Sequence, residues 1–289
     1  MSEVAQKIER ISVQALDDIL GVPFQVHDKG FVRVIDYMGN DDAICQMARV
    51  SYGQGTKQVS EDRGLIRYLM RHRHTSPFEG CEIKLHIKMP IFIARQWVRH
   101  RTASINEYSG RYSEMKDEFY IPPLEYVKGQ STSNKQGSEG KLEEHVVRNF
   151  VYDLDEKCAN DYMHYTTAIS EGVARETARI GLPLNLYTEW YWKIDLHNLL
   201  HFISLRSDPH AQQEIRDYSD VIYKSILPLW VPHTFEAFED YMIGGARFSA
   251  MELEMIKRAF ADKMFFNDKT GKMSQRELDE FIKKVGKAN

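Results

Sequence analysis

The chain has 289 residues and a formal net charge of −4, with 28% charged and 43% hydrophobic residues, which is ordinary for a globular protein. A negative net charge argues against general nucleic-acid binding, because binding driven by counterion release needs a basic surface. Three widely spaced cysteines without a CxxC pair favour free buried thiols over a disulfide framework. With no signal-like apolar run and no stretch of ~20 apolar residues, the sequence predicts a cytoplasmic protein with no membrane partner.

The first elements follow from the spacing of apolar residues. Apolar positions at helical spacing predict a helix over residues 4–20, and alternation predicts a strand over residues 31–37. A second helix is expected through Val50, because Asn40 or Asp41 can cap its N-terminus.

A third helix is predicted from Ser60, with acidic residues in its first turn, to Met70. It runs into RHRH at residues 71–74, and cations at a helix C-terminus explain that run without a ligand. The clearest strand covers residues 81–89, where charged and apolar side chains alternate. Pro90 then suits the first turn of a further helix.

A dense polar segment, RHRTASINEYSGRY, occupies residues 99–112 and follows an apolar approach. Unpaired charges in an apolar interior cost several kcal/mol each, so this segment cannot form ordinary core. A buried run that ends in a cluster of donors and one carboxylate is typical of a polar ligand site. A solvated basic loop is the alternative, which the interleaved Ser, Asn and Glu disfavour.

The second half of the chain is predicted to be mostly helical. Residues 128–141 are polar and Gly/Ser-rich and indicate a surface insertion. A long amphipathic helix over residues 142–169 needs a partner surface, either the sheet or another subunit. Residues 185–192 are aromatic and predict a strand or a buried turn. Helices are expected from Asp195 to Arg206 and again from Pro209.

The tail from about residue 248 is charged and predicts two helices joined by a loop at residues 267–272. The loop has some of the spacing of a calcium-binding EF-hand, but Phe266 would take the first ligand position, so no calcium site is predicted. We expect a main domain over residues 1–247 and a helical appendage over residues 248–289. Deleting residues 263–289 is expected to leave the main site intact.

Four arginines stand out as candidate anion ligands. Arg99 and Arg111 lie in the polar segment, Arg179 lies between apolar residues, and Arg206 ends a helix with an apolar face. A guanidinium does not lose its proton, so each must find an anion. For a single arginine, an internal carboxylate is the simpler partner. Several converging arginines instead suit a phosphate and an anionic ring.

These segments resemble one known family. Residues 99–112 fit RHRxxSxNExSxRY, the motif of flavin-dependent thymidylate synthases, at every specified position. TARIGLPLN at residues 177–185 and LRSDPHAQQEIR at residues 205–216 are similar to the family's ARxxLPxN and LRxxxHAQxEI segments. The resemblance spans roughly residues 28–229. It implies an α+β fold with an antiparallel sheet packed with helices, assembled as a homotetramer with active sites shared between subunits.

The resemblance also implies a reaction: reductive methylation of dUMP to dTMP with bound FAD, methylenetetrahydrofolate as carbon donor and NADPH as reductant, without an enzyme nucleophile. Arg206 is the implied catalytic residue beside the uracil ring, and Arg179 is expected to reach dUMP from a neighbouring subunit. The implied dUMP contacts are Gln96, Trp97, Val98, Arg99, Glu107, Tyr108, Ser109, Gly110, Arg111, Arg179 and Arg206. The implied FAD contacts are Ser76, Arg99, His100, Arg101, Glu107, Asp195, Leu196, His197 and His201. Some family members differ from this chain at Asp195, His197 and His201.

Three alternatives to this function remain. A nucleic-acid-binding module would use the two basic runs, and an inactive family member would keep the fold without the activity. A metal-dependent hydrolase would use His197 and His201, which have HxxxH spacing, but no glutamate follows His197 as in HExxH, so no metal site is predicted. No GxGxxG turn is present, so a Rossmann cofactor domain is unsupported.

Overall fold

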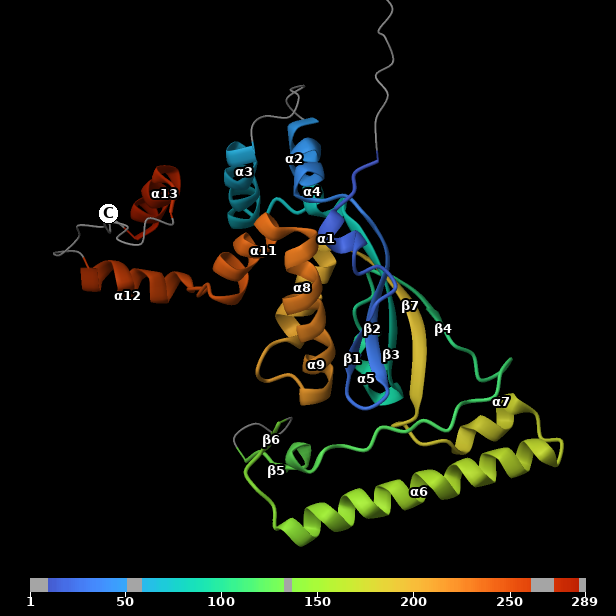
Figure 1. The fold of residues 1–289 in the computed structure, drawn as a ribbon. Coiled ribbons are helices and arrows are strands. Elements are labelled where there is room, and N and C mark those ends of the chain that lie inside the picture. Colours follow the sequence, from blue (N-terminus) through green and yellow to red (C-terminus); the bar gives the residue numbers. More distant parts are fainter. Residues whose placement is uncertain (1–9, 51–58, 133–136, 261–272, 286–289) are drawn as a thin grey trace, which may run out of the picture.

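The computed structural model describes residues 10–50, 59–132, 137–260 and 273–285. Its centre is a five-stranded sheet in the order β1-β2-β3-β7-β4, and every neighbouring pair is antiparallel (Figure 1). The strands are β1 (Pro23–Val26), β2 (Gly30–Met38), β3 (Glu82–Pro90), β4 (Ser104–Glu107) and β7 (Tyr187–Asp195). The predicted combination of helices with an antiparallel sheet is confirmed.

The two faces of the sheet differ as the alternation in β3 predicts. Ile83, Leu85 and Ile87 are buried on the core side. The opposite face is polar, where His86 lies 3.1 Å from Glu189 of the neighbouring strand β7. One face of the sheet is therefore available to build the core, and the helices cover that face.

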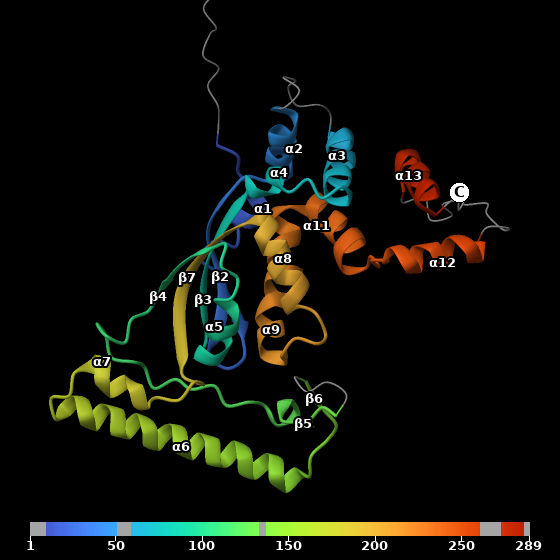
Figure 2. The same cartoon turned by 180° about the vertical axis from the view of Figure 1, so that it is seen from behind.

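The helices that pack on this face come from both halves of the chain: α5 (Ile91–Trp97), α8 (Leu196–Arg206) and α9 (Gln213–Val221) (Figures 1 and 2). Around them and beyond one end of the sheet lie α2 (Asp41–Val50), α3 (Val59–Arg71), α4 (Ser76–Glu79), α10 (Leu227–Trp230) and α11 (Pro232–Phe238). Two π-helical turns, η3 (Ile222–Ile226) and η4 (Glu239–Ile243), follow α9 and α11. Trp97 is fully buried among them and stacks on Phe202 with ring centroids 4.5 Å apart, which fixes α5 against α8.

Helix α6 (Glu144–Ser170) lies across one end of the sheet (Figure 1). Cys158 and Tyr165 of α6 are buried in a second, smaller core with Phe119. Towards the start of the helix the predicted apolar face is open, because Val146 and Phe150 are exposed. Short elements flank α6: η1 (Leu124–Tyr126), β5 (Gly129–Gln130), β6 (Ser138–Glu139), α7 (Arg175–Ala178) and η2 (Arg179–Gly181). The predicted insertion contains the β5–β6 pair.

The tail forms α12 (Ala250–Phe260) and α13 (Gln275–Val285), so both predicted tail helices are confirmed. The loop predicted at residues 267–272 lies outside the described residues. Helix α12 leads away from the body of the protein (Figures 1 and 2). Helix α13 returns to α3 and is joined to it by ion pairs.

The helix predicted over residues 4–20 is wrong where the structure describes it, because only α1 (Gln14–Asp17) is helical. Tertiary contacts take the place of local propensity there: Arg10 pairs with Asp36 at 3.1 Å, and the Val13 N–H donates to the Tyr37 hydroxyl at 2.6 Å. The segment therefore follows β2 instead of coiling.

Other predictions differ in detail. Strands β1 and β4 and helix α4 were not predicted, and each is only four residues long. For residues 185–192 the strand alternative is confirmed by β7. The helix expected from Pro209 begins later, at Gln213, because the Asp208 carboxylate accepts from the His210 N–H at 2.8 Å and closes a turn. No described helix is long and apolar enough to cross a membrane.

Candidate active site

Most of the predicted site residues fall into three places. The first, called here the Arg206 cavity, has a volume of about 350 Å³. The second, the Ser76 cavity, has a volume of about 1030 Å³. The third is the Ser109 turn, made of residues 107–111 together with Arg179.

The Arg206 cavity lies where the end of α5 meets α8. It is lined by Arg99, His100, Arg101, Thr102, Ile194, Asn198, His201, Leu205 and Arg206. The Arg206 Nε donates a hydrogen bond to His100 Nε2 at 3.0 Å, and its Nη2 donates to the Gln96 carbonyl at 3.4 Å. Within the described residues no carboxylate pairs with Arg99, Arg101 or Arg206. Three cations beside one cavity without internal counterions make it suited to an anion.

His100 is held neutral by its surroundings. Burial and the positive charges of Arg206 and His201 lower the pKa of His100 to about 4. The neutral ring accepts from Arg206 through Nε2, which assigns its remaining proton to Nδ1. Burial also lowers the pKa of Arg206, but the ordinary value for arginine is so high that the guanidinium stays charged.

Two of the predicted FAD residues, at the start of α8, have structural roles. Asp195 caps the helix: its Oδ1 accepts from the Asn198 N–H at 2.9 Å and its Oδ2 from the Asn198 side chain at 2.8 Å. The Leu196 side chain is fully buried in the core, so only its main chain could meet a ligand. His201 is exposed and lines the Arg206 cavity, while His197 does not line it.

The Ser76 cavity is bounded by α3, the segment after it, and α13. Ser76 is exposed at its wall, directly after Arg73, His74 and Thr75, which also line it. Arg73 has a positive φ of 57°, an uncommon conformation for a residue with a side chain. The sequence explained RHRH mainly as a helix terminus, with a contact to nucleic acid as the alternative. Arg71 does end α3, but it also pairs with Glu280 of α13.

The Ser109 turn is held by contacts around its own end of the molecule. The Thr188 hydroxyl donates to Glu107 Oε1 at 2.7 Å, and Arg111 pairs with Glu176 at 3.1 Å. Gly110 is buried, and a Cβ placed on it would lie 3.2 Å from Cδ of Arg179. The structure therefore brings Arg179 next to the motif of its own chain.

Two further predicted residues use their side-chain hydroxyls in hydrogen bonds within this chain. The Tyr108 hydroxyl donates to the Glu114 carbonyl at 2.6 Å, and the Ser109 hydroxyl accepts from the Arg111 N–H at 3.3 Å.

The three predicted dUMP residues at the end of α5 differ in what their side chains contact. Trp97 is fully buried, so its side chain belongs to the core and only its main chain could reach a nucleotide. Val98 is exposed. The Gln96 side chain is bonded to Gln212, in the segment that resembles the family's HAQ motif.

Strand β4 leads from the Arg206 cavity to the Ser109 turn. Ser104 pairs with Lys193 and Glu107 with Trp190, which is about 10 Å further along β7 at the usual rise of a strand. No residue of the turn is among those that line the Arg206 cavity. Within one chain the predicted dUMP contacts therefore lie in two separate groups.

The described ranges contain no cluster of three or more His, Cys, Asp or Glu side chains that could hold a metal ion. Cys45, Cys81 and Cys158 are buried and form no disulfide, as predicted. Burial raises the pKa of the Cys81 thiol to about 12, so it is not a thiolate at neutral pH.

Comparisons with known proteins agree with the resemblance read from the motifs. The family Thy1, described as thymidylate synthase complementing protein, matches residues 33–233. A flavin-dependent thymidylate synthase of Rickettsia bellii is 52% identical over 288 residues, covering 95% of this chain and 97% of the relative. One from Gluconobacter oxydans is 51% identical over 278 residues, covering 95% and 91%.

A solved structure with a similar fold is a UMP/dUMP methylase, PolB, from Streptomyces cacaoi, bound with 5-Br dUMP. It has a TM-score of 0.68 and 31% identity, over 76% of this chain and 98% of that one. The family match covers more than half of the sequence, and the relatives are similar over nearly their full length. The chain belongs to the family of flavin-dependent thymidylate synthases.

Proposed function

We propose that this protein methylates dUMP reductively to dTMP, with methylenetetrahydrofolate as carbon donor and NADPH as reductant. Bound FAD supplies the hydride chemistry. The observation that carries the proposal is Arg206, a half-buried guanidinium that has no carboxylate partner in the described residues and is held by neutral His100. The UMP/dUMP methylase of similar fold, bound with 5-Br dUMP, supports the same substrate class.

The residues present fit a flavin dinucleotide. FAD carries two phosphates, and cations without internal counterions are what such a ligand requires. Arg99 and Arg101 are exposed beside the Arg206 cavity, and Ser76 offers a hydroxyl in the Ser76 cavity. We assign six residues to FAD: Ser76, Arg99, His100, Arg101, Glu107 and His201.

Arg206 is assigned to the uracil ring. A fixed cation stabilises negative charge that develops on the ring during carbon transfer, and in a partly buried site this interaction is stronger than in water. His100 acts as a positioning residue, because its hydrogen bond orients the guanidinium without adding a second positive charge.

The complete site is assigned to more than one subunit. Arg206 and the Ser109 turn form separate groups in one chain, which supports a site in which a second copy supplies one of the two groups. The exposed apolar residues at the start of α6, Val146 and Phe150, favour a contact with another subunit. A homotetramer with shared sites is the assembly proposed.

An absorbance spectrum of the purified protein tests the function. We expect a flavin spectrum, or one gained on adding FAD, that bleaches with NADPH and responds to dUMP. Formation of dTMP from dUMP and methylenetetrahydrofolate should follow. A protein that stays colourless after FAD is added would contradict the proposal and leave nucleic-acid binding, tested by salt-dependent retention on polynucleotide, as the next candidate.

A further inference from the structure

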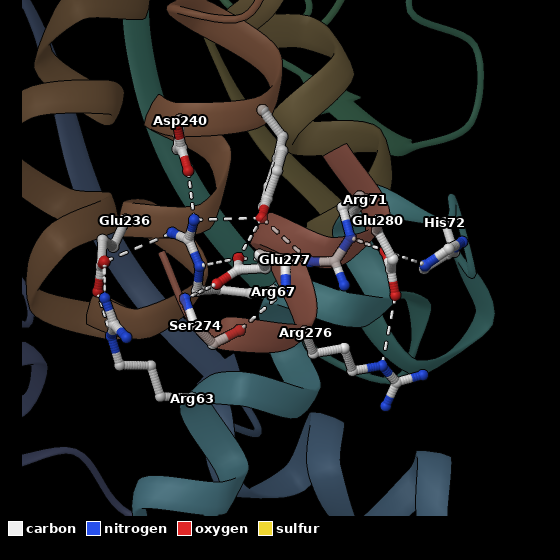
Figure 3. Close-up of polar contacts among 11 residues, drawn as sticks. Arg63, Arg67, Arg71, His72, Glu236, Asp240, Ser274, Arg276, Glu277 and Glu280 are labelled. Carbon is white, nitrogen blue, oxygen red and sulfur yellow. Dashed lines mark hydrogen bonds and ion pairs between the residues drawn. The ribbon is translucent and has the colours of Figure 1, made fainter. Parts of the chain in front are cut away.

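One buried carboxylate fixes α13 to the body of the protein (Figure 3). Glu277 is only 5% exposed, and its Oε1 accepts from Arg67 Nε at 2.6 Å and from Arg71 Nη1 at 3.3 Å. It also accepts a hydrogen bond from the Tyr241 hydroxyl. These contacts join α13 to α3 and to the turn after α11.

The same carboxylate starts the helix. The Ser274 N–H donates to Glu277 Oε2 at 2.7 Å, and the Glu277 N–H donates to the Ser274 hydroxyl at 3.3 Å. This reciprocal pair is a capping box. Burial acts to raise the pKa of Glu277, but hydrogen bonds from Tyr241, Ser274 and Arg67 lower it to about 2, so the anchor is charged at neutral pH.

A second carboxylate strengthens the junction. Glu280 accepts from Arg71 Nε at 2.6 Å and lies 3.1 Å from His72 Nε2 (Figure 3). On the other side of the junction Arg67, 4% exposed, is bonded to Asp240. The position of α13 is therefore set by a network of charges, and such networks are directional.

This docking makes α13 a wall of the Ser76 cavity. Ser274, Arg276 and Glu277 line the cavity together with Ser76. The Arg276 guanidinium lies over the Tyr68 ring, 4.4 Å from its centroid, and Tyr68 lines the same cavity. The Arg276 side chain is 69% exposed, and among the described residues its ion pair is with Glu280, at 3.3 Å. Most of its donors are therefore available to a ligand.

The lining of the cavity carries an excess of positive charge. It includes the arginines Arg49, Arg71, Arg73 and Arg276 and one carboxylate, Glu277. That carboxylate is paired with Arg67 and Arg71, and Glu280, outside the lining, pairs with Arg71 and with one nitrogen of Arg276. Arg73 and the remaining donors of Arg276 therefore supply the positive charge that a ligand would meet. A cavity of about 1030 Å³ with this charge suits a phosphate-bearing ligand larger than a mononucleotide.

We propose that α13 is part of the flavin site: it closes one side of the Ser76 cavity, and Arg276 binds the phosphates of FAD. Glu277 is a positioning residue that holds Arg276 at the cavity through Arg67 and Arg71. The inference rests on the proposed function, because it takes FAD as the ligand. It reverses the expectation from sequence that deleting residues 263–289 leaves the flavin site intact.

The first test compares Arg276→Ala with Arg258→Ala in protein freed of flavin. Arg258 is the matched control, since it is an exposed arginine on α12 with the same i,i+4 glutamate pairing and lies outside the cavity lining. Binding is followed by flavin fluorescence with FAD and with riboflavin, which lacks both phosphates. We expect Arg276→Ala to weaken FAD binding about tenfold and riboflavin binding by less than about twofold.

The second test removes the anchor. Glu277→Gln, compared with Asp279→Asn on the exposed side of α13, and deletion of residues 263–289 should each weaken FAD binding by at least about tenfold. FAD affinities of these variants equal to those of their controls or of the wild type would overturn the role of α13 while the proposed function stands. If the wild-type protein itself binds no FAD, both fail.

Discussion

His100 and Arg206 illustrate how a single residue can orient a charge. Protonated His100 would place a second cation 3.0 Å from the Arg206 guanidinium, so burial and this repulsion hold the pKa of His100 at about 4. The imidazole therefore stays an acceptor from about pH 5 upwards. The arginine keeps its orientation and its full charge, and no carboxylate in the described residues competes for it.

The residue-scale prediction concerns Arg206→Ala. Because Arg206 is assigned to charge on the uracil ring, we expect turnover to fall about 100- to 1000-fold, as when a single stabilising donor is removed from other active sites. FAD content, measured by absorbance, should remain that of the wild type. Arg206→Lys keeps the charge and loses the fork of donors, so intermediate activity is expected. Wild-type turnover in the alanine variant would exclude the assigned role.

At the scale of elements, α13 shows how a short tail helix is made part of a larger structure. An isolated helix of this length is marginal in water. The capping box of Ser274 and Glu277 satisfies donors at its start, and Arg67 and Arg71 supply the tertiary partners. Helix α13 therefore depends on α3 for its stability.

The element-scale prediction is the pH dependence of this docking. The folded-state pKa of Glu277 is about 2, below the ordinary value of 4.5, so its stabilisation is complete above about pH 5 and is lost as the pH falls through this interval. We expect slow hydrogen exchange in residues 275–285 at pH 5 to 8, and faster exchange in Glu277→Gln at the same pH. The difference between the two proteins should shrink below about pH 4. Its disappearance already at pH 6 would contradict the anchoring role.

At the scale of the whole molecule, the separation of Arg206 from the Ser109 turn is the main feature. Arg179 lies beside Gly110 at the turn, about 10 Å or more along β7 from the strand positions next to the Arg206 cavity. This separation supports the proposal above that a nucleotide contacting both Arg206 and Arg179 takes them from different copies of the chain.

Mixing two inactive variants tests this arrangement. Arg179→Ala and Arg206→Ala are each expected to be nearly inactive alone. If every site draws these arginines from different subunits, random reassembly of the two variants in equal amounts should restore about a quarter of the wild-type activity. Reassembly of each variant with itself is the control. No recovery in mixed assemblies of confirmed composition would place both arginines in one subunit's site.

Secondary structure was predicted best where one periodicity dominates a long segment. Strand β3 and helices α2, α3, α6 and α8 agree with the sequence within a few residues, because each presents a continuous apolar face. Short elements were missed: β4 is four residues within a polar motif, and its strand conformation depends on pairing with β7. Where the structure describes it, the helix predicted over residues 4–20 failed because Arg10 and Val13 find partners on β2.

The sequence alone determined the family, the flavin-dependent chemistry that the family implies, and most of the residues around Arg206. These could be read from the sequence because the motif consists of specific side chains at fixed spacings along the chain. Tertiary structure alone decided that Trp97 and Leu196 point into the core and that Asp195 caps α8. It also decided that Arg67 and Arg71 meet Glu277 from more than 200 residues away. Such contacts leave no periodicity in the sequence, because ion pairs and caps depend on where chain segments meet in space.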